Sequence, residues 1–208
     1  DGTGATYCVE DTSPCEKGHK RDSNGACIES EAGSVGDGQK YENCVEGSYS
    51  DKDGASVCTL CAAGKFGTER GSTNEDKGCL ACPVGYYVSS IGATACIICP
   101  PGSACLVQAK TEYSECEIGS YQDLPGRPYC LECPSGRYQH QRGTATCVHC
   151  PKGKFNQNEG STSEDACVAC PPGKYANQNG MEQCTQCIVG SYQPESDQIT
   201  CKVCAEEY

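Results

Sequence analysis

The chain has 208 residues, of which only 25 are Leu, Ile, Val or Phe and none is Trp, so it cannot bury a core of the usual size. Cysteine supplies 22 residues, a share typical of extracellular folds in which disulfide bonds replace that core. The formal charge is −12 without a basic cluster, which excludes nucleic acid as a favoured partner. No apolar run approaches the ~20 residues of a membrane span, so we expect no direct membrane insertion of this segment.

The first predicted segment, residues 1–43, has widely spaced cysteines at Cys8, Cys15 and Cys27, followed by a Gly-, Ser- and acid-rich run. We expect an irregular cysteine-containing segment here. Its part from Cys15 to Cys27 is either a worn copy of the repeat that follows or a small growth-factor-like loop.

A repeat of about 17 residues starts at Cys44 and has the form Cys-x-x-Gly-x-aromatic, first seen as Cys44, Gly47 and Tyr49. Each glycine is expected to form a tight or positive-φ turn, which folds the ring back over a nearby disulfide. Ring and disulfide together would then be the core of each repeat. Sixteen cysteines form eight Cys-x-x-Cys pairs, namely Cys58/Cys61, Cys79/Cys82, Cys96/Cys99, Cys130/Cys133, Cys147/Cys150, Cys167/Cys170, Cys184/Cys187 and Cys201/Cys204.

The repeats fall into two predicted blocks, residues 44–99 and 116–204. Two similar insertions, 71–76 and 160–165, lie 89 residues apart and indicate a longer duplication. Residues 100–115 between the blocks are expected to be an irregular connector, because Ala104 stands where the ring should be. Residues 205–208 form a tail, and Cys204 opens a further repeat, at which the chain either ends or continues as a longer array.

Loop lengths favour one set of disulfides, although spacing alone does not fix connectivity. In six of the eight complete repeats, 13 residues separate the second cysteine of one pair from the first of the next. The two insertions change this length without disturbing the neighbouring repeats, as a self-contained loop would allow. We predict the pairs Cys15–Cys27, Cys44–Cys58, Cys61–Cys79, Cys82–Cys96, Cys99–Cys105, Cys116–Cys130, Cys133–Cys147, Cys150–Cys167, Cys170–Cys184 and Cys187–Cys201.

This pairing leaves Cys8 and Cys204 without an evident partner. They would pair with parts of a longer chain, with each other or with a second copy of the protein. For Cys8, joining the N-terminal framework is the simpler interpretation. The fold class that follows is one of small disulfide-rich tandem repeats: an extended rod of short β-hairpins and turns, with little helix and no large hydrophobic core.

Other uses of the cysteines are disfavoured. Cys58/Cys61 with Cys79/Cys82 has the spacing of a zinc ribbon, but every pair is about equally distant from both neighbours, and nothing separates individual metal sites. A redox role would need one Cys-x-x-Cys in a thioredoxin-like setting. We therefore predict no metal site and no cofactor.

Catalytic and calcium-binding motifs are also missing. The runs 22–25 and 51–54 resemble the middle of a calcium loop, but the first ligand position falls on Lys20 and Tyr49, so we expect turns. The three histidines accompany no hydrolase motif, and no catalytic residue is predicted. The Ser and Thr of 71–74 and 160–163 are candidates for O-glycan, with a solvated loop as the alternative.

The run Cys130-Leu-Glu-Cys133-Pro-Ser-Gly136-Arg-Tyr138, matched at 167–175, resembles the ephrin-receptor-like cysteine-rich repeats. The resemblance covers residues 44–204. It implies an extracellular protein, since such repeats occur in receptor ectodomains, in surface antigens of protists and in proteins of extracellular filaments.

We accordingly expect a non-enzymatic structural protein, secreted or at the cell surface, that self-associates as a subunit of a coat or filament. The alternative is a receptor-like ectodomain or surface antigen that binds a protein partner through exposed rings, for which Tyr86, Tyr113 and Tyr129 are the candidates.

Overall fold

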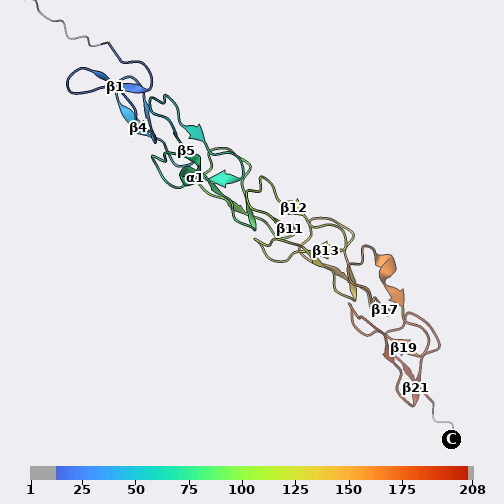
Figure 1. Cartoon of the computed structure of the whole chain (residues 1–208). Coiled ribbons are helices and arrows are strands. Elements are labelled where there is room, and N and C mark those ends of the chain that lie inside the picture. Colours follow the sequence, from blue (N-terminus) through green and yellow to red (C-terminus); the bar gives the residue numbers. More distant parts are fainter. Residues whose placement is uncertain (1–12, 206–208) are drawn as a thin grey trace, which may run out of the picture. The chain divides into compact units, whose positions relative to one another are not determined.

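The computed structural model describes residues 13–205 (Figure 1). These residues form two compact units. The first holds the described chain up to Pro83 together with Tyr87–Ile97 and Gln108–Thr111. The second holds Val84–Tyr86, Ile98–Val107 and the described chain from Glu112 onward.

Short antiparallel hairpins and turns make up both units, as the sequence predicts. The described residues form eleven two-stranded sheets. Two short helices, α1 (Glu75–Gly78) and η1 (Glu164–Ala166), begin at the ends of the two insertions. The hairpins are β1–β2 (His19–Arg21, Cys27–Glu29), β3–β4 (Ser34–Gly36, Tyr41–Asn43), β5–β6 (Ser48–Tyr49, Thr59–Leu60), β7–β8 (Lys65–Phe66, Leu80–Ala81), β9–β10 (Tyr86–Tyr87, Ile97–Ile98), β11–β12 (Ser103–Ala104, Ser114–Glu115), β13–β14 (Ser120–Tyr121, Leu131–Glu132), β15–β16 (Arg137–Tyr138, Val148–His149), β17–β18 (Lys154–Phe155, Val168–Ala169), β19–β20 (Lys174–Tyr175, Thr185–Gln186) and β21–β22 (Ser191–Tyr192, Lys202–Val203).

A glycine at positive φ starts each hairpin of the repeat and also joins it to the following repeats. Gly136, with φ +79°, accepts a 2.9 Å hydrogen bond from the backbone N–H of Cys150. Its own N–H donates to the carbonyl of Asn156 at 2.7 Å. A β-carbon at Gly136 would lie 2.1 Å from the carbonyl oxygen of Gly180, which belongs to the next repeat but one. Only glycine fits both the φ angle and this approach.

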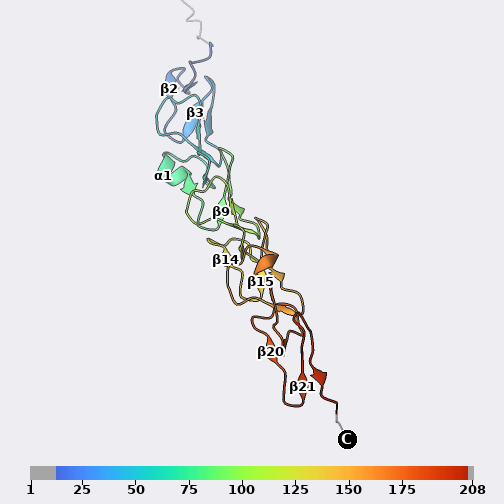
Figure 2. The ribbon, with the colours of Figure 1, turned by 90° about the vertical axis from the view of Figure 1, so that its right-hand side faces the viewer.

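The same bonds recur in the first unit. Gly64 donates to Val88 at 2.8 Å and accepts from Cys82 at 2.9 Å, and its β-carbon position lies 2.2 Å from the carbonyl oxygen of Ala109. These repeats therefore contact the next two repeats along the chain, and not only the adjacent one. Figures 1 and 2 show the hairpins of the second unit, from β13 to β21, following one another in chain order.

A second position in each repeat, in the loop between the strands, also takes positive φ. From Cys44 onward, seven of these positions are glycine. At six of them the residue just before an earlier Cys packs over the glycine: the Cδ of Glu115 lies 3.2 Å from the β-carbon position of Gly143. At Gly54 the covering residue is Glu29, which precedes Ser30. Ala109 and Asp197 are the two exceptions among the described residues, with φ of 56° and 62°. At the corresponding covering positions stand Ala81 and Ala169, the smallest covering side chains in the array.

The interior of the repeats consists mainly of cystine and of small or polar side chains, serines and amides among them. Cys82, Cys99 and Cys133 have no exposed surface. The expected rings contribute less than predicted, since Tyr138 is the one repeat ring buried among the described residues. Instead, the side chain just after the ring is buried in several repeats. The residues buried at this position are Ser50, Val88, Gln122, Gln139, Asn156, Ala176 and Gln193.

The two segments expected to be irregular differ from that expectation where the structure describes them. In 13–43, the hairpins β1–β2 and β3–β4 form, and the backbone N–H of Ser30 donates to Gly18 as a cysteine does elsewhere. In 100–115, Ala104 pairs with Ser114 as a ring residue would. The repeat tolerates loss of its ring because backbone hydrogen bonds define the hairpin.

Candidate functional site

A ladder of ten disulfides is the main chemical feature of the described chain. Each rung except one closes a loop with a sequence separation of 12–18 residues, and Cys99–Cys105 has a separation of 6. The bonds are Cys15–Cys27, Cys44–Cys58, Cys61–Cys79, Cys82–Cys96, Cys99–Cys105, Cys116–Cys130, Cys133–Cys147, Cys150–Cys167, Cys170–Cys184 and Cys187–Cys201, the same pairs that the loop lengths favour.

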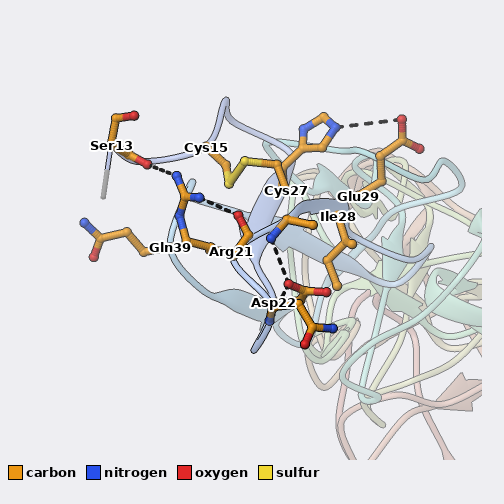
Figure 3. The surroundings of a disulfide bond; sticks show 12 residues. Ser13, Cys15, Arg21, Asp22, Cys27, Ile28, Glu29 and Gln39 are labelled. Carbon is orange, nitrogen blue, oxygen red and sulfur yellow. Dashed lines mark hydrogen bonds and ion pairs between the residues drawn. A yellow bond between two sulfur atoms is a disulfide. The ribbon is translucent and has the colours of Figure 1, made fainter. Parts of the chain in front are cut away.

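The first rung shows how polar groups secure the loop that a disulfide closes (Figure 3). The guanidinium of Arg21 donates to the carbonyls of Ser13 and Gly25. The carboxylate of Asp22 accepts from the backbone N–H of Ala26 at 2.9 Å. This carboxylate, which we considered as part of a calcium-like loop, therefore caps a turn.

Asp53 belongs to the other run that resembles a calcium loop, and it also binds a backbone group. Its Oδ1 accepts a hydrogen bond from the N–H of Ala32 at 2.8 Å. Within residues 13–205, no group of three or more His, Cys, Asp or Glu side chains is placed to hold a metal ion. No helix in that range is long and apolar enough to cross a membrane.

Cys204 is exposed, and it is the single free cysteine of the described chain. Its backbone N–H donates to the carbonyl of Gly190 at 2.9 Å, as the cysteines that open other repeats do. Cys204 thus occupies the first cysteine position of a repeat. Cys8 lies outside the described residues.

The two inserted loops share a local design. Lys65 pairs with Glu75 at 2.6 Å in the first, and Lys154 pairs with Glu164 at 3.7 Å in the second. The carboxyl of Glu75, by its hydrogen bond and its charge, raises the pKa of Lys65. Among the O-glycan candidates, Thr73 and Thr162 are exposed, whereas Ser72 and Ser161 are buried.

The rings considered for partner binding are exposed on the second unit. Tyr129 has 59% of its surface exposed, compared with 36% for Tyr86 and 40% for Tyr113. Exposed aliphatic side chains are not confined to the region of these rings. They recur just after the first cysteine of Cys-x-x-Cys, at Leu80, Ile97, Leu131, Val148 and Val168.

Backbone position identifies two further residues that the sequence alone did not single out. Ser30 and Tyr41 occupy the two cysteine positions of the repeat that contains β3 and β4, since Gly36 pairs with Tyr41 and Cys44 donates to Gly33. A signal was present in the spacing: Cys27-Ile-Glu-Ser30 and Tyr41-Glu-Asn-Cys44 are both Cys-x-x-Cys with one cysteine replaced.

Comparison with known proteins identifies the repeat. The family model described as tyrosine-protein kinase ephrin type A/B receptor-like matches residues 75–112, 106–145, 125–167 and 173–208, which together make up more than half of the chain. A search of curated proteins found no match. Repeats of this type are non-catalytic, disulfide-rich extracellular modules, and the many disulfides likewise indicate an extracellular location. The chain therefore belongs to the ephrin-receptor-like family of cysteine-rich repeats.

Proposed function

We propose that this chain is a non-enzymatic structural protein that serves as a subunit of an extracellular coat or filament. The observation that carries the proposal is the repeated set of backbone hydrogen bonds. In both units the hairpin glycine donates to the next repeat, and the first cysteine of that repeat donates back to the glycine. The chain thus uses its regular surface for cohesion between repeats, which suits a spacer.

The distribution of exposed apolar groups supports the same proposal. A recognition module would concentrate them in one patch, as protein interfaces do. Here the exposed aliphatic side chains are spread along the described chain, and five of them recur at one position of the repeat, for example Leu131 and Val148 with 40% exposure each. A receptor-like ectodomain stays the alternative, with Tyr129 as its best anchor.

Self-association is the expected partner interaction. With a formal charge of −12, two copies repel each other, so noncovalent assembly should strengthen as salt screens that charge. A disulfide between Cys204 of one copy and Cys204 of another would be a covalent route that salt does not affect. The two routes can therefore be separated by experiment.

Electron microscopy of the native secreted material, with and without reductant, tests this function. Regular filaments or arrays made of this chain are the expected result. Light scattering on the purified chain and on Cys204→Ser, at low and high salt, would show which route joins the copies. Monomers under every condition, together with a soluble protein recovered in a specific complex, would replace the proposal with the receptor-like alternative.

A further inference from the structure

The covalent ladder is interrupted in the first unit. Elsewhere in that unit, successive disulfides are joined by the two residues of a Cys-x-x-Cys, as between Cys58 and Cys61. Between Cys27 and Cys44 the chain runs for 16 residues without a crosslink. This interval is a whole repeat, which we call the open repeat (residues 28–43).

The open repeat is folded like its crosslinked neighbours. Its strands β3 and β4 pair Ser34 with Asn43. Gly33 donates to the carbonyl of Ser50 at 2.8 Å, as Gly136 does to Asn156. Gly36 donates to Ala55 at 3.1 Å, as Gln139 does to Ser161 at 3.0 Å. The loss of the disulfide therefore leaves the hydrogen-bond pattern intact.

Two residues with hydroxyl groups, Ser30 and Tyr41, occupy the two cysteine positions of the open repeat. Ser30 is fully buried, and its Oγ donates to the carbonyl of Ala55 at 3.2 Å. The hydroxyl of Tyr41 donates to the carbonyl of Ile28 at 2.7 Å. The Tyr41 bond closes the open repeat, and the Ser30 bond ties it to the following repeat. Both are contacts that break and re-form without redox chemistry. A disulfide-closed loop does not lengthen until its bond is cleaved.

We propose that the open repeat is an extensible element, which yields when the chain is pulled and re-forms when the tension is released. The inference rests on the proposed structural function, because only a load-bearing chain makes use of such an element. Opening it would detach the first disulfide loop, Cys15–Cys27, from the repeats that follow, since Gly18 and Gly33 lose their partners Gly36 and Ser50.

Chain geometry sets the length that the element can release. The 17 Cα-to-Cα steps from Cys27 to Cys44, at roughly 3.5 Å per step, span about 60 Å when extended. A Cys-x-x-Cys link has three such steps and spans only about 10 Å. The interval from Cys105 to Cys116, with 11 steps and no crosslink, would give about 40 Å. The three kinds of link are distinguishable by length.

Single-molecule pulling on the full chain under non-reducing conditions tests the proposal. We expect a reversible lengthening step approaching 60 Å, less the distance that the open repeat already spans when folded. In S30C/Y41C the new disulfide should abolish that step and leave the step from the 105–116 interval as an internal reference. Reductant added to S30C/Y41C should restore the step. The matched control S30A/Y41F, which cannot crosslink, should lengthen at lower force.

An unchanged step in S30C/Y41C, with the new disulfide verified by mass spectrometry, would overturn the proposal. Where that disulfide fails to form, hydrogen exchange of the wild-type chain decides: the Gly36 amide should exchange at least tenfold faster than the Ser50 amide, which occupies the same position in a crosslinked repeat. Equal exchange rates at the Gly36 and Ser50 amides would refute the proposal that the open repeat is extensible. Filament formation is tested separately, by electron microscopy. Failure to assemble would reject the proposed function, whereas the lengthening step in the pulling experiment would still be measurable.

Discussion

Replacing Gly136 by Ala tests whether close backbone contact between alternate repeats holds the array together. A residue with a β-carbon at positive φ costs about 1–2 kcal/mol. The added β-carbon at Gly136 would also lie 2.1 Å from the Gly180 oxygen, far inside van der Waals contact. Relief of that clash must weaken bonds between repeats, such as those donated by Gly136 and Asn156, each worth about 1 kcal/mol.

Gly25→Ala is the matched control, because Gly25 has φ +82° but nothing within 4 Å of its β-carbon position. We expect a cost of about 3–4 kcal/mol for Gly136→Ala and about 1–2 kcal/mol for Gly25→Ala. Native-state hydrogen exchange, read at the amides beside each substitution, should differ by roughly 30-fold between the two variants, since 1.4 kcal/mol is tenfold. Equal losses of protection would show that strain at positive φ accounts for the whole cost and that the close contact between repeats adds nothing to stability.

Three further predictions concern single repeats. In S30C/Y41C, the added disulfide should raise the stability of the open repeat by about 2–3 kcal/mol, measured by exchange with and without reductant, and an unstable variant would contradict the assigned cysteine positions. Backbone N–H groups of Lys40 and Gln39 hold the pKa of Asp37 below its usual 3.8, so this turn is stabilised above that pH and should lose protection as the pH falls below about 4. Asp37→Asn, which keeps the acceptor but does not titrate, should abolish that pH dependence, and a persistent effect would assign it to another group. The buried amide of Gln139 donates to Thr146 at 2.7 Å and accepts from Gln141 at 3.0 Å, so Gln139→Leu should destabilise its repeat by about 1–3 kcal/mol in thermal unfolding, whereas exposed Gln141→Leu should not.

The sequence predicts the ladder well because disulfide loops leave a record in spacing. Cys133 and Cys147 bound a loop of the commonest length, and the structure joins them. The positive φ of Gly136 is also predictable from the sequence, because so tight a hairpin needs a residue that adopts positive φ easily, and glycine does. Even the two insertions are visible from their shared Gly-Ser-Thr run.

Features that depend on the third dimension are not predictable in this way. Nothing in the spacing says that Gly136 meets Gly180 two repeats away, because the two residues are 44 positions apart. The burial of Gln139 is not predictable from the sequence, because its amide is buried only where the fold places hydrogen-bond acceptors beside it, such as the carbonyl of Thr146. The open repeat left only a weak signal, because Ser30 and Tyr41 preserve the spacing and the fold without preserving the cysteines.

The ladder also determines how the chain responds to cleavage by proteases. A peptide bond cut between Cys133 and Cys147 leaves both pieces joined through their disulfide, so the molecule is nicked without losing length. A cut between Cys27 and Cys44 has no such bridge and separates the first loop from the rest of the chain. Most loops of this protein can therefore be damaged at the surface while the chain stays in one piece.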